Sequence, residues 1–368
     1  MIDIKSSQKT KVYLGMSGGV DSAVSAVLLL NQGYDVTGIY MKNWSNEDFG
    51  IETDCPWQED MKDVQQVCEQ LGIEFRSYNF EKEYRERVVE NFFAEYKAGR
   101  TPNPDVLCNS EIKFDSFLSK ALSEGADFIA TGHYARIQND DGYKLLKGVD
   151  SNKDQSYFLS GLNQFQLSKT IFPVGEFTKP EVRRIAKENN ISVAEKKDSQ
   201  GICFIGDIDV GKFLRSNIAY SPGDIVDADT ELKIGSHDGV AFYTIGQREG
   251  LKIGGMSPDQ KPYFVCGKDI NLNVLYVVEG NDNPKLFRSS LVLSKINWIA
   301  GKINFPKNGE VVECEISIRY RQKPVKCKIK FSDNTAIVNF ENPIRAVSAG
   351  QVGVMYLDEV CLGNGVID

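Results

Sequence analysis

Residues 13–22 read Tyr-Leu-Gly-Met-Ser-Gly-Gly-Val-Asp-Ser, and this stretch decides the fold. An apolar run ends at Met16, two adjacent glycines follow, and a helical stretch rich in alanine and leucine begins at Asp21. Adjacent glycines let backbone N–H groups approach an anion closely, and the following helix N-terminus adds the positive end of its dipole. The loop lacks the lysine of a Walker motif, so it is a phosphate loop of another kind. We therefore predict that a nucleotide binds here, with Asp21 placed to hold a magnesium ion or to cap the helix.

Strand and helix signals alternate around this loop. The strand signals lie at 11–16, 35–41, 73–79 and 127–130, and the helical signals lie at 21–32, 57–71, 81–97 and 111–123. This alternation predicts an α/β domain in which helices cover both faces of a parallel sheet. Farther along, Asp141-Gly142 predicts a hairpin turn. The sequence Thr178-Lys179-Pro180-Glu181 predicts a capped helix that runs to Asn190.

Beyond about residue 218 the helical periodicity disappears, and short strands are separated by turns rich in Gly, Pro, Asn and Asp. The turns at 221–224 and 281–284 are typical of domain boundaries. We predict three domains: an α/β domain at 1–218, a small mostly-β domain at 219–284, and an all-β barrel or sandwich at 285–368.

Composition excludes several classes of protein. The chain has 368 residues with no run of apolar residues long enough to cross a membrane, and its polar start is not a secretory signal, so we expect a cytoplasmic protein. Its eight cysteines include no CxxC pair, and it has only two histidines. This pattern argues against a zinc site or an iron–sulfur cluster.

The charge is distributed unevenly. The net charge is −8, yet the segment from Leu286 to the end holds eleven Lys/Arg against eight Asp/Glu. Within it, residues 319–330 contain six basic residues and no acidic one. Such a stripe fits a polyanion, with Arg319 and Arg321 placed to hold phosphates and Tyr320 to stack on a base. The alternative is a solvated, lysine-bearing edge strand that discourages aggregation.

Two cysteines stand apart from the others. Cys108 follows the polar loop 99–107 near the start of a helix, where the helix dipole favours a thiolate, and Asp105 is a candidate acid or base. Cys203 lies in Asp-Ser-Gln-Gly-Ile-Cys-Phe at 198–204. Both segments are too polar to form a core. We expect the remaining six to be buried structural cysteines: Cys55, Cys68, Cys266, Cys314, Cys327 and Cys361.

The loop and six further motifs together resemble the bacterial tRNA-specific 2-thiouridylases (the MnmA/TrmU family), which are N-type ATP pyrophosphatases. The further motifs lie, in order, at 38–44, 103–109, 131–136, 153–157, 198–204 and 319–322. The match spans essentially the whole chain. It implies a PP-loop catalytic domain, related to the adenine-nucleotide alpha-hydrolases, and a C-terminal β-barrel that binds tRNA.

The resemblance also implies roles for individual residues. It makes Cys203 the carrier of a persulfide, Cys108 its partner nucleophile and Asp105 the group that moves protons. It implies that ATP contacts Gly15, Met16, Ser17, Gly18, Gly19, Val20, Asp21, Ser22, Met41 and Gly132. It implies that the target base contacts Asn103, Pro104 and Asp105, and that tRNA contacts His133, Lys153, Asp154, Gln155, Arg319, Tyr320 and Gln351.

The implied reaction replaces the C2 oxygen of the wobble uridine by sulfur. ATP, with magnesium, adenylates that oxygen, and a persulfide donor protein supplies the sulfur. Another adenylating ATP pyrophosphatase, such as an amidotransferase-type synthetase or argininosuccinate synthase, is the main alternative, although it has no use for two active cysteines. A non-catalytic RNA-binding or nucleotide-sensing protein is the second. A metal- or cluster-dependent thiolation enzyme is disfavoured by the missing CxxC.

Overall fold

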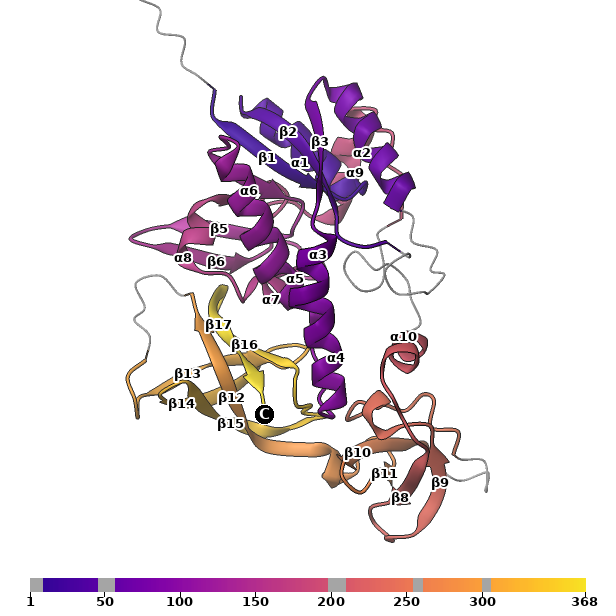
Figure 1. Cartoon of the computed structure of the whole chain (residues 1–368). Coiled ribbons are helices and arrows are strands. Elements are labelled where there is room, and N and C mark those ends of the chain that lie inside the picture. Colours follow the sequence, from indigo (N-terminus) through magenta and orange to yellow (C-terminus); the bar gives the residue numbers. More distant parts are fainter. Residues whose placement is uncertain (1–8, 46–56, 198–209, 254–260, 300–305) are drawn as a thin grey trace, which may run out of the picture.

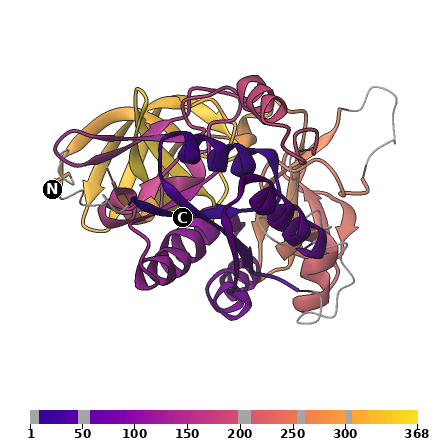
Figure 2. The same cartoon turned by 90° about the horizontal axis from the view of Figure 1, so that it is seen from above.

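The computed structural model describes residues 9–45, 57–197, 210–253, 261–299 and 306–368. An α/β domain lies at the top of Figure 1, with the C-terminal barrel and a small β domain below it. Seen from above, the barrel and the small β domain lie on opposite sides of the molecule (Figure 2). The described helices include none with the length and apolar character needed to cross a membrane.

The α/β domain is built on a parallel sheet whose five described strands have the order β3-β2-β1-β4-β7. Both faces are covered. Val12 and Leu14 point into one core with helices α1, α2 and α9, whereas Tyr13 points into a second core on the other face. The predicted fold class is confirmed. The strands are β1 (Lys11–Met16), β2 (Asp35–Lys42), β3 (Glu74–Asn79), β4 (Phe128–Thr131) and β7 (Thr170–Ile171); the flanking helices are α1 (Val20–Asn31), α2 (Trp57–Leu71) and α9 (Lys179–Glu188).

Two long helical segments cover the second core. The first runs down between the barrel and the small β domain (Figure 1), as α3 (Glu81–Tyr84), η2 (Arg85–Val89) and α4 (Glu90–Lys97). The second comprises α5 (Pro104–Cys108), η3 (Asn109–Phe117) and α6 (Leu118–Ser123). It begins seven residues earlier than the predicted start at 111, because Asn103 caps it by accepting the Val106 N–H at 3.2 Å and proline occupies its first turn. The shorter helices are α7 (Ser156–Leu159), α8 (Gln164–Ser168) and α10 (Val210–Asn217).

The small β domain is a sheet whose four described strands have the order β10-β11-β8-β9. Its core contains Ile225, Val265 and Leu275, each fully buried. Its elements are β8 (Gly223–Asp227), β9 (Lys233–His237), η4 (Val240–Phe242), β10 (Tyr263–Asp269), β11 (Val274–Glu279) and the short turn η5 (Pro284–Leu286).

The C-terminal sheet closes into a barrel, because β12 pairs with both β15 and β17 across its six described strands. The predicted hairpin is also present, as β5 (Ala135–Asn139) and β6 (Tyr143–Lys147), with Asp141 at φ +66° in its turn. Unexpectedly, β6 pairs with β17, so a hairpin from the α/β part of the chain extends the barrel sheet. The barrel strands are β12 (Phe287–Trp298), β13 (Val311–Ser317), β14 (Val325–Ser332), β15 (Thr335–Arg345), β16 (Val352–Leu357) and β17 (Val360–Ile367).

Candidate active site

The phosphate loop occupies the junction between β1 and α1. Gly18 has φ +74°, and a Cβ at this position would lie 2.8 Å from the Asp60 carbonyl oxygen. Only glycine therefore fits between α2 and the loop without displacing backbone. Ser22 closes the loop: its Oγ donates to the Gly19 carbonyl at 3.0 Å and accepts the Ser17 N–H at 3.4 Å. Ser17 is exposed, so a ligand can reach the loop.

The residues expected to contact ATP converge at this loop from three strands. A Cβ on Gly132, just after β4, would lie 2.8 Å from the Ser22 nitrogen, and one on Gly15 would lie 2.9 Å from the Met41 Cε. The loops after β1 and β4 thus meet between two neighbouring strands of the sheet. The strand order continues from β1 to β2 on one side and from β4 to β7 on the other. In parallel α/β sheets this carboxyl edge is where ligands bind.

Lys179 and Tyr134 belong to the site and were missed by sequence reasoning. The Lys179 Nζ donates to both carboxylate oxygens of Asp21, at 2.7 and 2.9 Å, and the Tyr134 hydroxyl donates to one of them at 2.7 Å. Asp21 makes no capping bond, so that part of the expectation is wrong. Lys179 is only 8% exposed. The signal that identifies it is electrostatic, since a lysine in the first turn of a helix opposes the dipole and needs an anionic partner.

The carboxylates beside the loop are already paired. Asp21 binds Lys179, and Asp60 binds the Lys196 ammonium at 2.7 Å. Within the described residues there is no group of three or more His, Cys, Asp or Glu side chains arranged to hold a metal ion.

His133 lies under the site in a buried position. One ring nitrogen lies 2.6 Å from the Thr131 hydroxyl and the other 3.4 Å from the Lys113 ammonium, and Phe114 and Phe172 flank the ring. Burial, reinforced by the Lys113 charge, lowers the pKa of His133 well below its usual value. His133 is therefore neutral near pH 7, and it is buried in this structure rather than exposed to an RNA backbone.

Cys108 sits in a different environment from the expected one. It is fully buried in the larger core of the α/β domain, the core that also contains Met41 and Phe117, at the end of α5. The expectation that its surroundings are too polar for a core is wrong, because the helix begins at Pro104 and turns Val106 and Cys108 inward. Asp105, three residues before Cys108, is half-buried. Cys203 lies outside the described residues.

The described cysteines expected to be structural are all buried. Burial raises the pKa of Cys68 and of Cys266 to about 11, and that of Cys361 to about 12. Cys314 and Cys327 face each other on β13 and β14 with their sulfurs 3.9 Å apart. With their raised pKa values, Cys68, Cys266 and Cys361 hold little reactive thiolate at neutral pH. Cys55 lies outside the described residues.

The loop before α5, expected to contact the target base, is anchored to both β domains. The Gln351 side chain donates to the Thr101 and Pro102 carbonyls at 2.8 and 3.2 Å. Thr101 also donates its N–H to Ala349 of the barrel at 2.8 Å, and its hydroxyl lies 3.1 Å from that of Thr244 in the small β domain. Gln351 therefore positions the loop that leads to Asp105 and Cys108.

The segment 153–155 organises its own backbone. The Asp154 carboxylate accepts the N–H groups of Gly148 and Ser156 at 3.0 and 3.1 Å, and burial raises its pKa. The Gln155 side chain accepts the Tyr134 N–H at 2.9 Å. The bond to Tyr134 holds the segment against the residues that follow β4, and the bond to Gly148 holds it against the residue that follows β6. Lys153 is half-buried at its start.

The basic stripe at 319–330 is partly buried, and acidic side chains on the neighbouring strand offset part of its positive charge. Arg319 is half-buried, and its Nη2 donates to Ile245 and Ala346 carbonyls at 2.8 and 3.0 Å, which joins the small β domain to the barrel. Tyr320 packs on Phe158, with ring centroids 4.3 Å apart. On β14 the lysines do point outward, but Lys328 pairs with Glu313 at 2.8 Å. The strand lies inside the barrel sheet between β13 and β15, so it is not an edge strand.

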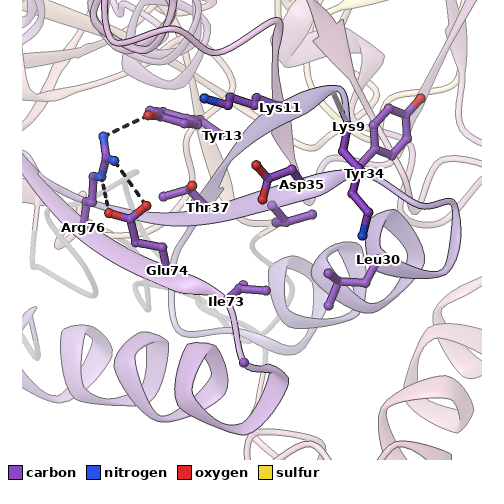
Figure 3. Close-up of a pocket in the computed structure, with 12 residues that line it drawn as sticks. Lys9, Lys11, Tyr13, Leu30, Tyr34, Asp35, Thr37, Ile73, Glu74 and Arg76 are labelled. Atoms are coloured by element: carbon purple, nitrogen blue, oxygen red, sulfur yellow. Dashed lines mark hydrogen bonds and ion pairs between the residues drawn. The ribbon is translucent and has the colours of Figure 1, made fainter. Parts of the chain in front are cut away.

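A separate pocket of about 290 Å³ lies at the opposite end of the parallel sheet (Figure 3). Lys11, Asp35 and Glu74, the first residues of β1, β2 and β3, line it. The Arg76 guanidinium spans Glu74 and the Tyr13 hydroxyl there, at 2.8 Å from each. Because this is the amino edge of the strands, the pocket is distinct from the phosphate loop.

The fold and site define a nucleotide-binding α/β domain of the phosphate-loop class followed by two β domains. Three family models match in that order: the tRNA methyl transferase HUP domain at 10–207, the tRNA methyl transferase PRC-barrel domain at 211–279 and the aminomethyltransferase β-barrel domain at 288–367.

Full-length relatives agree. The tRNA-specific 2-thiouridylase MnmA of Francisella tularensis subsp. novicida is 49% identical over 98% of this chain and 99% of its own length. MnmA 2 of Geobacillus kaustophilus is 51% identical over 99% of this chain and 96% of its own length. The chain therefore belongs to the tRNA-specific 2-thiouridylase family. Among solved structures, the NMN synthetase of Francisella tularensis aligns at 18% identity and TM-score 0.30 over 51% of this chain and 66% of its own, too weakly to bear on the fold.

Proposed function

We propose that this chain is a tRNA-uridine 2-sulfurtransferase that uses ATP to make 2-thiouridine at the wobble position. The observation that carries this proposal is the near-complete coverage, at about half identity, by relatives named tRNA-specific 2-thiouridylases. The convergence of Gly15, Gly132 and the phosphate loop at the carboxyl edge of the sheet supports the use of a nucleotide.

Adenylation is the first step, because a carbonyl oxygen does not leave unaided. The uridine O2 attacks the α-phosphorus of ATP and pyrophosphate departs. The loop 17–22 and the α1 N-terminus stabilise the charge that develops on the phosphates. Lys179, held by Asp21 at the loop, adds a cation at the same place. Magnesium bound with ATP would supply further neutralisation of the phosphate charge.

Sulfur transfer is the second step. Cys203 carries a persulfide, whose terminal sulfur attacks C2 and displaces AMP. In one route Cys108 attacks the Cys203 sulfur, which leaves a Cys108–Cys203 disulfide and passes the outer sulfur to the base. In the other, Cys108 first releases that sulfur as sulfide, which then attacks C2. Asp105, three residues before Cys108, handles the protons around the base.

The substrate and partners follow from this chemistry. The wobble base leaves the anticodon stack to reach Cys108, and the loop 103–105 receives it. Lys153, Arg319 and Tyr320 contact tRNA. The barrel at 285–368 is the main tRNA-binding domain, and it follows a catalytic domain at 1–218 and a small β domain at 219–284. Once a thiol reductant has cleaved the Cys108–Cys203 disulfide, a persulfide-bearing protein of the cytoplasm passes its outer sulfur to the Cys203 thiolate.

The test is nucleoside analysis of tRNA after incubation with ATP, magnesium and a persulfide donor. Wild-type protein is expected to form 2-thiouridine, and Cys108→Ser and Cys203→Ser are expected to form none. Cys361→Ala is the matched control, because Cys361, on β17, is fully buried in the same core as Cys108 and has a raised pKa. If both serine variants thiolate normally, the cysteine assignment is wrong.

The same experiment separates the rival functions. Pyrophosphate release that depends on tRNA excludes a non-catalytic RNA-binding protein. An amidotransferase-type enzyme would keep its activity in Cys203→Ser. A methylated product, the activity named in the family-model descriptions, has a different mass from a thiolated one and would overturn the proposal.

A further inference from the structure

Asn43 has a buried side chain whose polar atoms lack a hydrogen-bond partner within the part of the chain that the structure describes. It follows β2 directly, is 2% exposed, and neither its Nδ2 nor its Oδ1 has a hydrogen-bond partner among the described residues. Native proteins pair nearly all buried polar groups, because an unpaired donor or acceptor keeps the full penalty of losing water. A carboxamide with both ends unpaired within the described residues therefore points to a partner that those residues do not supply.

The backbone on both sides of Asn43 is held firmly. The Lys42 carbonyl accepts the Phe80 N–H at 2.8 Å, and the Lys42 ammonium lies 3.1 Å from the Glu81 carboxylate. Trp44 packs edge-on against Phe213, with ring centroids 5.7 Å apart. Asn43 is thus fixed in place between two anchored neighbours, so its unpaired amide is a built feature of the site.

The position of Asn43 relates it to the nucleotide. Met16, the last residue before the phosphate loop, pairs with Tyr40, and Asn43 lies three residues farther along the same edge. Strand spacing and rise place its Cα about 11 Å from that of Met16. Met41, two residues before Asn43, reaches the Gly15 position. A nucleotide whose phosphates occupy the loop can extend its base over this distance.

We propose that the Asn43 carboxamide hydrogen-bonds the edge of a heterocyclic base during the reaction. One carboxamide offers a donor and an acceptor side by side, which matches a base edge that presents an acceptor beside a donor. Two bases take part in the proposed function, on which this inference rests: the adenine of ATP and the target uracil. Both have such an edge, and the experiment distinguishes them.

The test compares Asn43→Leu with wild type in three measurements: thermal unfolding of the free protein, the dissociation constant for ATP, and the KM for tRNA. Because leucine removes an unpaired polar group, the free protein is expected to melt no lower than wild type. Base binding is expected to weaken at least about tenfold. Weaker ATP binding assigns Asn43 to adenine, and a higher KM for tRNA with unchanged ATP binding assigns it to uracil.

Two further variants keep the result decisive. Asn364→Leu is the matched control, because Asn364 is also buried but donates to the Ser160 hydroxyl at 2.9 Å. This variant should lower the melting temperature and leave ATP binding unchanged. Asn43→Ala repeats the test if the leucine variant does not fold. Binding of both ligands as in wild type would overturn the inference, whatever the melting temperature. Wild-type protein that binds no ATP would instead overturn the proposed function and this inference with it.

Discussion

Replacing Lys179 by methionine tests the ion pair at the phosphate loop. The substitution keeps the length of the side chain and removes the two bonds to Asp21, at 2.7 and 2.9 Å. Breaking a fully buried pair costs about 3–5 kcal/mol, and a hydrogen bond to a charged group contributes about 1.5–3 kcal/mol. Here the Lys179 side chain is 10% exposed but that of Asp21 is 29% exposed, which allows water to replace part of the interaction. We expect a loss of about 2 kcal/mol, or about 4–8 °C in melting temperature.

A double-mutant cycle isolates this contribution. Lys179→Met, Asp21→Asn and the double variant are unfolded thermally, and the coupling energy is expected to be about 2 kcal/mol. Lys187→Met is the control on the same helix, because its pair with Glu195 is exposed and its loss should leave the melting temperature nearly unchanged. Lys179→Met is also expected to slow ATP-dependent pyrophosphate release at least about tenfold. Coupling below about 0.5 kcal/mol together with normal pyrophosphate release would refute the reasoning.

Two further predictions concern Arg319 and His133. Arg319→Ala should lower the melting temperature, because one carbonyl of the small β domain and one of the barrel lose their donor. Arg321→Ala should leave the melting temperature unchanged and reduce the salt dependence of tRNA binding, because Arg321 is exposed. Identical responses of the two variants in melting and in salt titration would contradict this distinction. The pKa of His133 is lowered by burial, so the unfolded chain binds a proton below about pH 6.5 that the folded chain does not, and stability falls as the pH drops. Urea unfolding at about pH 7 and pH 5.5 should show a smaller loss for His133→Asn than for wild type; an equal loss would show that His133 is not the responsible group.

The α/β architecture was predictable because its signals are local. Apolar runs, the glycine pair at 18–19 and the cap at Thr178 each act within a few residues, and the structure has the expected strands and helices there. The start of the helix at Pro104 was missed although its Asn-Pro signal is local too. The burial of Cys108 was missed for the same reason, because which helical residues face a core depends on where the helix begins.

Ion pairs and hydrogen bonds between residues far apart in the chain could not be predicted from the sequence alone. The six basic residues at 319–330 appear as an uninterrupted stripe, but antiparallel pairing sets Glu313 and Glu315 opposite Lys328 and Lys326. Arg319 likewise finds carbonyl partners in another domain. Electrostatic character depends on which strands are neighbours, and strand order is a property of the whole fold.

The sequence by itself determined the phosphate loop, the class of the first domain and, through ordered motifs along the chain, the family. Backbone conformation and apolar periodicity are short-range properties, so they can be read from neighbouring residues. Tertiary structure alone decided that Asp21 is bound by Lys179, 158 residues away, and that Asn43 is buried without a hydrogen-bond partner among the described residues. Both outcomes depend on which groups the folded chain brings together or leaves apart, and hydrogen-bonding and ionic energies are set by those distances.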